Sequence, residues 1–327
     1  MSSRLRVLVT GIAGQDGSLL AELLCAEGAE VHGALRGPLD RELTNLTAVS
    51  AQLVLHDIDI EVPGLLEALI AQIVPDEVYH LAARAVVPES WLDPAGTIRS
   101  ITAPSAELIA ALCEHAPSAR VVIAGSREIF GNGAPSPQDE RTPANPSSPY
   151  GVAKLATHQL VGLAREHAGL HVSSAILFNH ESSRRPQSYV SRKVTRAAAA
   201  ISLGLADELV LGDLDAVRDW SAAKDIVRGM RLMARADAPG DYVLASGVGR
   251  TVRELVDAAF SVVGVDPSRH LRVDERFVRP PEASPPVGNP ARACEMLGWG
   301  AQTPFTQLIR EMVEFDLAEL RDRPETG

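Results

Sequence analysis

The 327-residue sequence has few cysteines, few lysines and few aromatic residues. Its three cysteines, Cys25, Cys113 and Cys294, are isolated and odd in number, which excludes a disulfide framework and fits a reducing compartment. No apolar run approaches the ~18 residues that a membrane helix needs. The first residues, 1–6, lead into a strand-like run without an apolar signal segment. These absences predict a cytoplasmic protein with no membrane partner.

Charge and motif content exclude several function classes. With 31 basic and 42 acidic side chains, the net charge of −11 argues against nucleic-acid binding but leaves room for a local basic pocket. The sequence contains no Gly-x-Ser-x-Gly elbow and no Walker A loop, which excludes the common serine hydrolases and P-loop kinases. His167 and His171 have helical spacing but no partner ligand at metal-site spacing, so we expect no metal site.

The first half of the chain alternates short β-rich runs with helical patterns. Such alternation predicts an α/β fold with a doubly wound parallel sheet of the Rossmann type. Strands are expected at Leu5–Val9, Glu30–Ala34, Leu53–His56, Glu77–Leu81, Arg120–Ala124 and Val172–Phe178. Helices are expected at Gln15–Glu27, Gly64–Ile73, Ala103–Glu114 and Gly151–His167.

The composition and the secondary-structure pattern of the sequence change near residue 180, where arginines cluster and helical patterns become more frequent than strands. This change predicts a dinucleotide-binding domain over residues 1–179 and a smaller, mainly substrate-binding lobe over 180–327, with later strands free to join the first sheet. Further helices are expected at Ser191–Leu203, Ala223–Ala236, Val252–Val263 and Phe305–Leu320, and short strands at Leu209–Leu211 and Tyr242–Ala245.

A glycine pattern follows the first expected strand directly. Gly11, Gly14 and Gly17 stand at Gly-x-x-Gly-x-x-Gly spacing at the entrance to a helix. Glycines let the backbone turn tightly against a pyrophosphate, and a helix N-terminus supplies free N–H groups. The pattern therefore predicts dinucleotide binding, although an ordinary strand–helix turn has similar spacing.

Residues after the next strands refine the cofactor prediction. Arg36 stands where NAD-binding proteins carry a ribose-binding acid, and an arginine there can meet a 2′-phosphate, which favours NADP over NAD. The alternative is a solvated surface arginine. Asp57 is placed to accept from an adenine amino group, and the small residues of Leu81–Ala83 leave room for a cofactor against the backbone.

A tyrosine and a lysine at helical spacing are the clearest chemical signal. Tyr150 and Lys154 lie at i and i+4, on one helical face, and a nearby ammonium favours a phenolate that can act as base or acid. With only 4 tyrosines and 3 lysines in the chain, chance rarely produces this pair, although a surface helix pair remains the alternative. Ser126 and Glu128 follow the fifth strand, where ligands of α/β sheets bind, and Glu128 is a candidate general base or a surface carboxylate.

These features together resemble the extended short-chain dehydrogenase/reductase superfamily. A narrower resemblance rests on further short blocks of sequence, which are Thr10–Asp16, Ala21–Leu24, Leu177–Ser182, Arg184–Arg185, Arg192–Lys193, Leu211–Asp215, Arg218–Trp220, Ala223–Asp225, Gly247–Val248, Val252–Glu254 and Arg279–Pro280. They resemble GDP-mannose 4,6-dehydratases from about Val7 to Trp299, and Asn179–Glu181 and Arg218–Trp220 are the most specific of them.

The resemblance implies a site and a reaction. It implies a nucleotide-sugar 4,6-dehydratase that uses NADP, acts on GDP-mannose and eliminates water across C5–C6 after temporary oxidation at C4. The implied catalytic residues are Ser126, Glu128, Tyr150 and Lys154. The implied cofactor residues are Gly11, Ile12, Ala13, Gly14, Gln15, Asp16, Arg36, Asp57, Ile58, Leu81, Ala82, Ala83, Arg84, Ala85, Tyr150, Lys154, His180 and Arg185. The implied substrate residues are Asn179, Lys193, Arg218, Arg279 and Glu282.

The sequence departs from the family pattern at three places. Ser126-Arg127-Glu128 stands where the family commonly has Thr-Ser-Glu, and Arg84-Ala85-Val86 replaces a polar run with Ser and His. The stretch after Arg36 is short and lacks the second of two adjacent arginines; in the family this loop helps to build a tetramer. We expect a homodimer or homotetramer.

The alternative functions are a nucleotide-sugar 4-ketoreductase or epimerase of the same superfamily, and a non-catalytic cofactor-binding protein.

Overall fold

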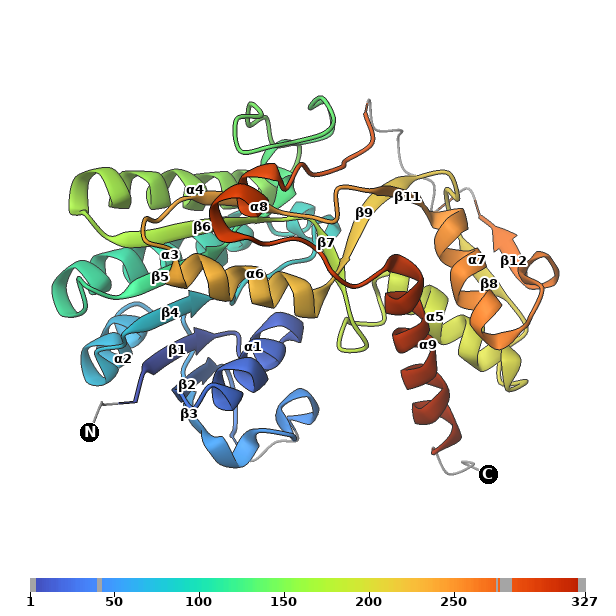
Figure 1. Ribbon diagram of the computed structural model, residues 1–327, viewed down its shortest axis with the longest axis horizontal. Coiled ribbons are helices and arrows are strands. Elements are labelled where there is room, and N and C mark those ends of the chain that lie inside the picture. Colours follow the sequence, from blue (N-terminus) through green and yellow to red (C-terminus); the bar gives the residue numbers. More distant parts are fainter. Residues whose placement is uncertain (1–3, 40–42, 275, 277–283, 323–327) are drawn as a thin grey trace.

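A seven-stranded parallel sheet forms the centre of the larger part of the molecule (Figure 1). The computed structural model describes residues 4–39, 43–274, 276 and 284–322. The sheet has the order β10-β6-β5-β4-β1-β2-β3. Its strands are β1 (Arg6–Thr10), β2 (Glu30–Leu35), β3 (Leu53–Asp57), β4 (Glu77–His80), β5 (Arg120–Ala124), β6 (His171–Leu177) and β10 (Asp241–Leu244). The predicted doubly wound α/β fold is confirmed.

Alternation along the strands builds a core on each face of this sheet. In β1, Val7 and Val9 pack with α1 (Gln15–Ala26) and α6 (Ala223–Arg235), whereas Leu8 packs on the opposite face. That second face is covered by α2 (Leu65–Ile73), α3 (Pro94–His115) and α4 (Pro149–Ala168). Burial on both faces explains why the strands are apolar throughout rather than alternately polar.

One predicted helix is much longer in the structure than in the sequence analysis. α3 has 22 residues and begins at Pro94, where the side chain of Asp93 accepts a hydrogen bond from the N–H of Gly96 at 2.8 Å. The expected start at 103 lay beside Pro104, which the helix contains in its interior. Proline usually interrupts a helix, so the local pattern concealed the first turns.

The smaller part of the molecule lies beside the carboxyl ends of the large sheet (Figure 1). Its main helices are α5 (Val190–Ser202), α7 (Val252–Val263) and α9 (Phe305–Arg321). Its strands are β7 (Asn179–Glu181), β9 (Val217–Ala222) and β11 (Gly249–Thr251) in one sheet, and β8 (Leu209–Leu211) and β12 (Leu271–Val273) in another. β7, β9, β11 and β12 were not predicted, because none of them contains a continuous apolar run.

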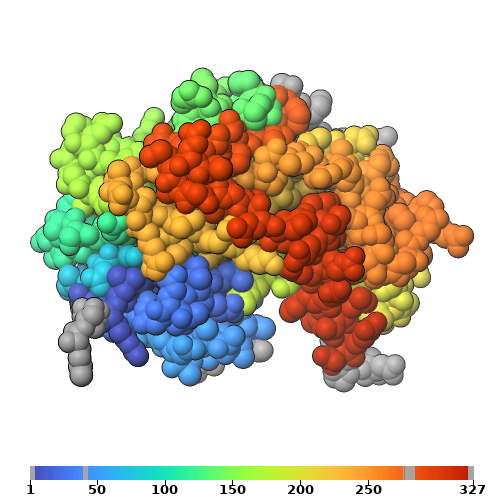
Figure 2. Space-filling view, in the orientation of Figure 1, coloured from blue at the N-terminus to red at the C-terminus, as the bar shows by residue number. Residues whose placement is uncertain are grey.

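The chain passes between the two parts more than once. α6 and β10 come from the second half of the sequence yet pack with α1 and pair with β6. The unpredicted helix α8 (Ala291–Leu297) also packs against α6 and β10. From α8 the C-terminal segment, red in Figure 2, runs across to the smaller part. Within the described ranges no helix is long and apolar enough to span a membrane.

Candidate active site

The order of the large sheet reverses between β1 and β4. Ligands of such sheets bind at the carboxyl ends of the strands beside this reversal. Here Thr10 Oγ1 lies 2.9 Å from His80 Nδ1 and accepts hydrogen bonds from the N–H groups of Leu81 and Ala82, each at 3.2 Å. Burial, aided by the charge of Lys154, lowers the pKa of His80 to about 3, so its ring is neutral. The sequence analysis missed both Thr10 and His80 because their contact joins strands 70 residues apart.

The glycine turn fits a dinucleotide. Gly11 has φ +70°, and a Cβ there would lie 2.9 Å from the backbone nitrogen of Ala82. Only glycine tolerates both the conformation and the approach. α1 begins at Gln15, and its N-cap residue, Gly14, provides no side-chain cap. The N–H groups at this helix end are therefore directed at the space above the turn, as pyrophosphate binding requires.

An ion pair connects the start of α1 with the smaller part. His180 Nε2 lies 2.9 Å from Asp16 Oδ2, while Gln15 Nε2 donates to the His180 carbonyl at 3.1 Å. Burial alone would raise the pKa of Asp16 and lower that of His180, but their mutual charge and hydrogen bond outweigh it in both. The pKa of Asp16 is lowered and that of His180 is raised. The pair fixes the relative position of two expected cofactor residues.

Two arginines meet one carboxylate beside the end of β2. Arg36 Nη1 lies 3.8 Å from Glu61 Oε1, and Arg84 Nη2 lies 3.0 Å from Glu61 Oε2. Asp57 Oδ1 accepts the N–H of Gly37 at 2.8 Å, and Ile58 is half-buried beside it. The structure therefore brings Arg84, which follows β4, close to Arg36, which follows β2. Neither spacing nor periodicity predicted this proximity.

The expected catalytic residues come together where α4 meets the end of β5. The Ser148 side chain caps α4 by accepting the Gly151 N–H at 3.0 Å, which places Tyr150 in the first turn. A Cβ on Gly151 would lie 2.6 Å from the Glu128 carbonyl oxygen, so this glycine lets α4 approach the short 3₁₀ turn η4 (Arg127–Ile129). As a result, the Ser126 hydroxyl lies close enough to Tyr150 to act on its pKa.

The charge states of Tyr150 and Lys154 differ from the sequence expectation. Burial lowers the pKa of Lys154 to about 8, and its Nζ donates to the Ala124 carbonyl at 2.7 Å. Burial also raises the pKa of Tyr150 well above its usual value; the Glu128 charge adds to this, although the hydrogen bond with Ser126 opposes it. The expected lowering of the tyrosine pKa by the lysine is therefore wrong for this structure. Lys154 Nζ lies 5.9 Å from the centre of the Tyr150 ring, and its charge is not among the main causes of the pKa shift of Tyr150.

Three of the expected substrate residues lie on described elements of the smaller part. Asn179 begins β7, Arg218 lies in the neighbouring strand β9, and Lys193 is exposed on α5. Arg279 and Glu282 lie outside the described residues. A residue that the sequence analysis missed organises this side: the buried Asp219 accepts the N–H groups of Ser246, Gly247 and Gly288 at 2.8, 3.0 and 3.1 Å. These hydrogen bonds hold the loop at Ser246 and Gly247 and the loop at Gly288 against β9, next to Arg218.

Tyr189 is a second residue that the sequence analysis missed. Its hydroxyl donates to the Ala85 carbonyl at 3.2 Å, and its ring stacks on the Arg185 guanidinium with 3.8 Å from Cζ to the ring centre. The positive charge of Arg185 lowers the pKa of Tyr150, against the larger effect of burial. The segment before α5 therefore reaches the residues after β4 and contributes to the electric field at Tyr150.

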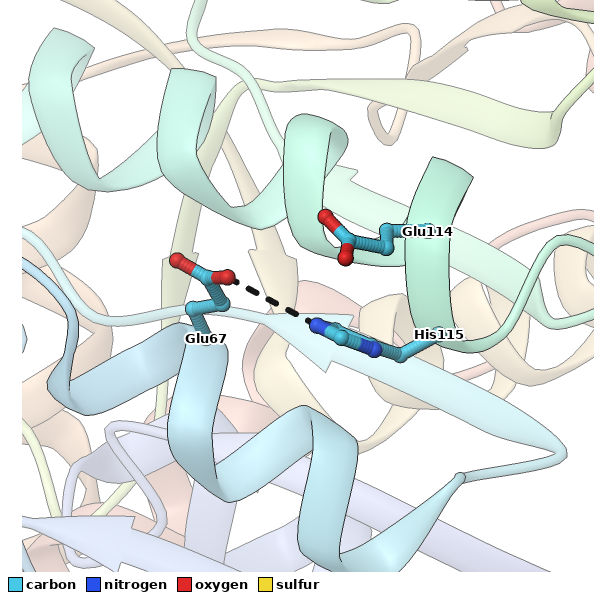
Figure 3. Close-up of side chains that lie close together, drawn as sticks. All are labelled: Glu67, Glu114 and His115. Atoms are coloured by element: carbon cyan, nitrogen blue, oxygen red, sulfur yellow. Dashed lines mark ion pairs between the residues drawn. The ribbon is translucent and has the colours of Figure 1, made fainter.

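A group of possible metal ligands lies elsewhere. Glu67 of α2 and Glu114 and His115 of α3 have side-chain atoms within 4.8 Å of one another, and His115 Nε2 lies 3.6 Å from Glu67 Oε1 (Figure 3). Both glutamates are exposed, and an exposed ion pair between neighbouring helices accounts for the arrangement. We therefore assign no metal to it.

Comparison with known proteins identifies the family. The profile described as GDP-mannose 4,6 dehydratase matches residues 8–312. GDP-mannose 4,6 dehydratase 1 of Arabidopsis thaliana is 39% identical over 322 residues, which cover 95% of this chain and 89% of that protein. The chain belongs to the GDP-mannose 4,6-dehydratase family. The GDP-mannose 4,6-dehydratase of Sinorhizobium fredii is 38% identical and covers 98% of this chain and 99% of its own. The resemblance seen in the sequence is thus confirmed.

A solved structure agrees with this placement. RMD from Pseudomonas aeruginosa, complexed with NADPH, has a TM-score of 0.82 and 26% identity, with 96% of this chain and 99% of that chain covered. Family membership confirms a nucleotide-sugar dehydratase of the hydro-lyase class and a nicotinamide dinucleotide cofactor.

Proposed function

We propose that this GDP-mannose 4,6-dehydratase family member converts GDP-mannose to its 4-keto-6-deoxy derivative with NADP as the recycled cofactor. The observation that carries the proposal is the convergence of Ser126, Glu128 and Tyr150 at the end of β5. The glycine turn after β1 lies two strands away in the same sheet. A bound nicotinamide dinucleotide supplies reversible hydride acceptance at this position.

Each residue has a role that its surroundings support. Tyr150 exchanges the proton of the C4 hydroxyl, and Ser126, whose hydroxyl acts on Tyr150, orients that hydroxyl. Lys154, held by the Ala124 carbonyl, binds the nicotinamide ribose. Glu128 removes the C5 proton, which the 4-ketone has acidified. The large-sheet part holds the dinucleotide, and Asn179, Lys193 and Arg218 of the smaller part hold the nucleotide sugar, together with Arg279 and Glu282.

A screen of nucleotide sugars by product mass tests the function. We expect GDP-mannose to lose water without net consumption of reduced cofactor. Stoichiometric consumption of NADPH with no loss of water would instead support the 4-ketoreductase alternative, and a product of unchanged mass would support an epimerase. Binding of cofactor and GDP without turnover would support a non-catalytic protein.

Cofactor preference depends on the two arginines at Glu61. A 2′-phosphate offers the same kind of oxygen acceptors as the Glu61 carboxylate, which both arginines meet. In the family pattern two adjacent arginines follow the second strand, whereas this chain has only Arg36 there. Arg84 can take the place of the second arginine. We expect Arg36→Ala to weaken NADP binding by about tenfold or more and to leave NAD binding nearly unchanged. Titration of both dinucleotides measures this. Equal affinity of the wild type for NADP and NAD, unchanged in the variant, would contradict the preference.

Nucleotide anchoring depends on cations of the smaller part. Arg218 is half-buried in β9, with its neighbour Asp219 fixing the adjoining loops. We expect Arg218→Ala to cost about 1.5–3 kcal/mol of GDP binding, since a charge-assisted contact to diphosphate is lost. Calorimetric titration of GDP tests it, with Arg253→Ala as a control for an exposed arginine paired with Asp215. Wild-type affinity in Arg218→Ala would place the nucleotide elsewhere.

Self-association is proposed through the face of α3 and α4. Large apolar side chains are exposed around the starts of these helices, with Trp91 64%, Leu92 86%, Ile98 42% and Val152 46% exposed. A second copy of the chain would cover them and form the expected homodimer, from which a homotetramer can be built. Analytical ultracentrifugation tests this, and a monomer at micromolar concentration would contradict it.

The three free cysteines are compatible with the cytoplasmic location that we also propose.

A further inference from the structure

Arg127 places a permanent positive charge inside the proposed active site. It lies in η4 between Ser126 and Glu128, and its side chain is only 7% exposed. Its Nε and Nη2 donate to Oε1 of Glu128 at 2.9 and 2.7 Å. Where the family commonly has a serine, this chain therefore has a guanidinium bound to the proposed base.

The backbone holds this pair in place. Sequence neighbours on a regular helix do not face each other, but η4 is a single 3₁₀ turn. On one side the N–H of Glu128 is bonded to Ser126 Oγ at 3.2 Å, and on the other Gly151 of α4 packs against the Glu128 carbonyl. The turn is thus fixed at both sides, and Arg127 and Glu128 are brought to the same side of it.

We propose that Arg127 is a positioning residue for Glu128. It holds Oε1 through two N–H bonds, and Oε2 is thereby directed at C5 of the hexose. This inference rests on the proposed dehydratase function and adds a residue that the family pattern does not contain.

The proton steps balance without any further reactant. Oε2 of Glu128 takes the C5 proton, and the C5–H electron pair forms the enolate of the 4-ketone. The enolate then forms the C5–C6 double bond as the C6–O bond breaks. The proton on Glu128 moves to the departing oxygen, which leaves as water and returns Glu128 to the carboxylate. Arg127 orients the first transfer and assists the second.

Arg127→Gln tests the inference through two steps measured separately. Oxidation at C4, followed by the absorbance of reduced dinucleotide in a single turnover, is expected to stay within about twofold of the wild type. Loss of water, followed by product mass, is expected to fall about 10–100-fold because the base is misplaced. Arg127→Lys, which keeps the charge, is expected to recover part of the loss, and Arg127→Ser shows what the residue common in the family does here.

Arg165→Gln is the matched structural control. Arg165 makes a two-bond contact with Asp241, at 2.8 Å each, away from the glycine turn and η4. We expect it to lower thermal stability without changing the ratio of the two rates. Loss of water at the wild-type rate in Arg127→Gln, or an equal slowing of both steps, would overturn the positioning role. A wild-type protein that removes water from no GDP-hexose would overturn the proposed function itself, and with it the inference.

Discussion

Glu128→Gln is expected to stop the reaction after the first hydride transfer. The amide keeps the shape of the side chain but cannot accept the C5 proton, so loss of water should slow by roughly 10²–10⁴-fold. In the proposed mechanism, oxidation at C4 requires Tyr150 rather than Glu128. Single-turnover absorbance should therefore show reduced dinucleotide that persists, while product mass shows no loss of water.

Two controls separate chemistry from structure in this variant. Exchange of C5–H for deuterium from heavy water should be lost in Glu128→Gln, because the same base is required. Glu27→Gln removes a carboxylate paired with Arg231 and Arg235, at 2.9 and 2.6 Å, near the C-terminal end of α1, and should leave both steps unchanged. If Glu128→Gln dehydrates substrate at the wild-type rate, Glu128 is structural, and the reductase or epimerase alternative becomes the better one.

Tyr150→Phe is expected to block the reaction one step earlier. Without the phenol, the proton of the C4 hydroxyl has no acceptor, and the rate of C4 oxidation should fall by roughly 10²–10⁴-fold. Burial raises the pKa of Tyr150, so the wild-type rate should increase with pH where this step limits turnover. Tyr150→Phe should lose that dependence. Pre-steady-state absorbance across pH 6–10 would measure it.

Tyr242→Phe is the matched control for the tyrosine. Tyr242 is 2% exposed in β10, and its ring lies 5.5 Å from Arg292 rather than beside the catalytic residues. It should therefore affect stability but not the hydride step. Rapid reduction of dinucleotide in Tyr150→Phe would assign the proton transfer to another group.

Most of the fold could be predicted from local sequence. The strands of the large sheet and the helices between them have apolar patterns that depend only on near neighbours, and the glycine turn lies where Gly11 was expected to bend the chain. The strands that were missed, such as β9 and β11, contain charged residues and no continuous apolar run. Their stability comes from pairing with each other and with β7, which no local pattern records.

The residue types of the site were also determined by the sequence. Tyr150 and Lys154 share a helical face because of their spacing, and Ser126 and Glu128 follow a strand because of their order. Only the tertiary structure decided what these side chains meet. Lys154 is bound to a carbonyl of β5, burial raises the pKa of Tyr150, Arg127 is bound to Glu128, and Arg84 reaches Glu61 beside Arg36. The physical reason is that charge and burial at a site are sums over segments far apart in the chain, and packing alone brings those segments together.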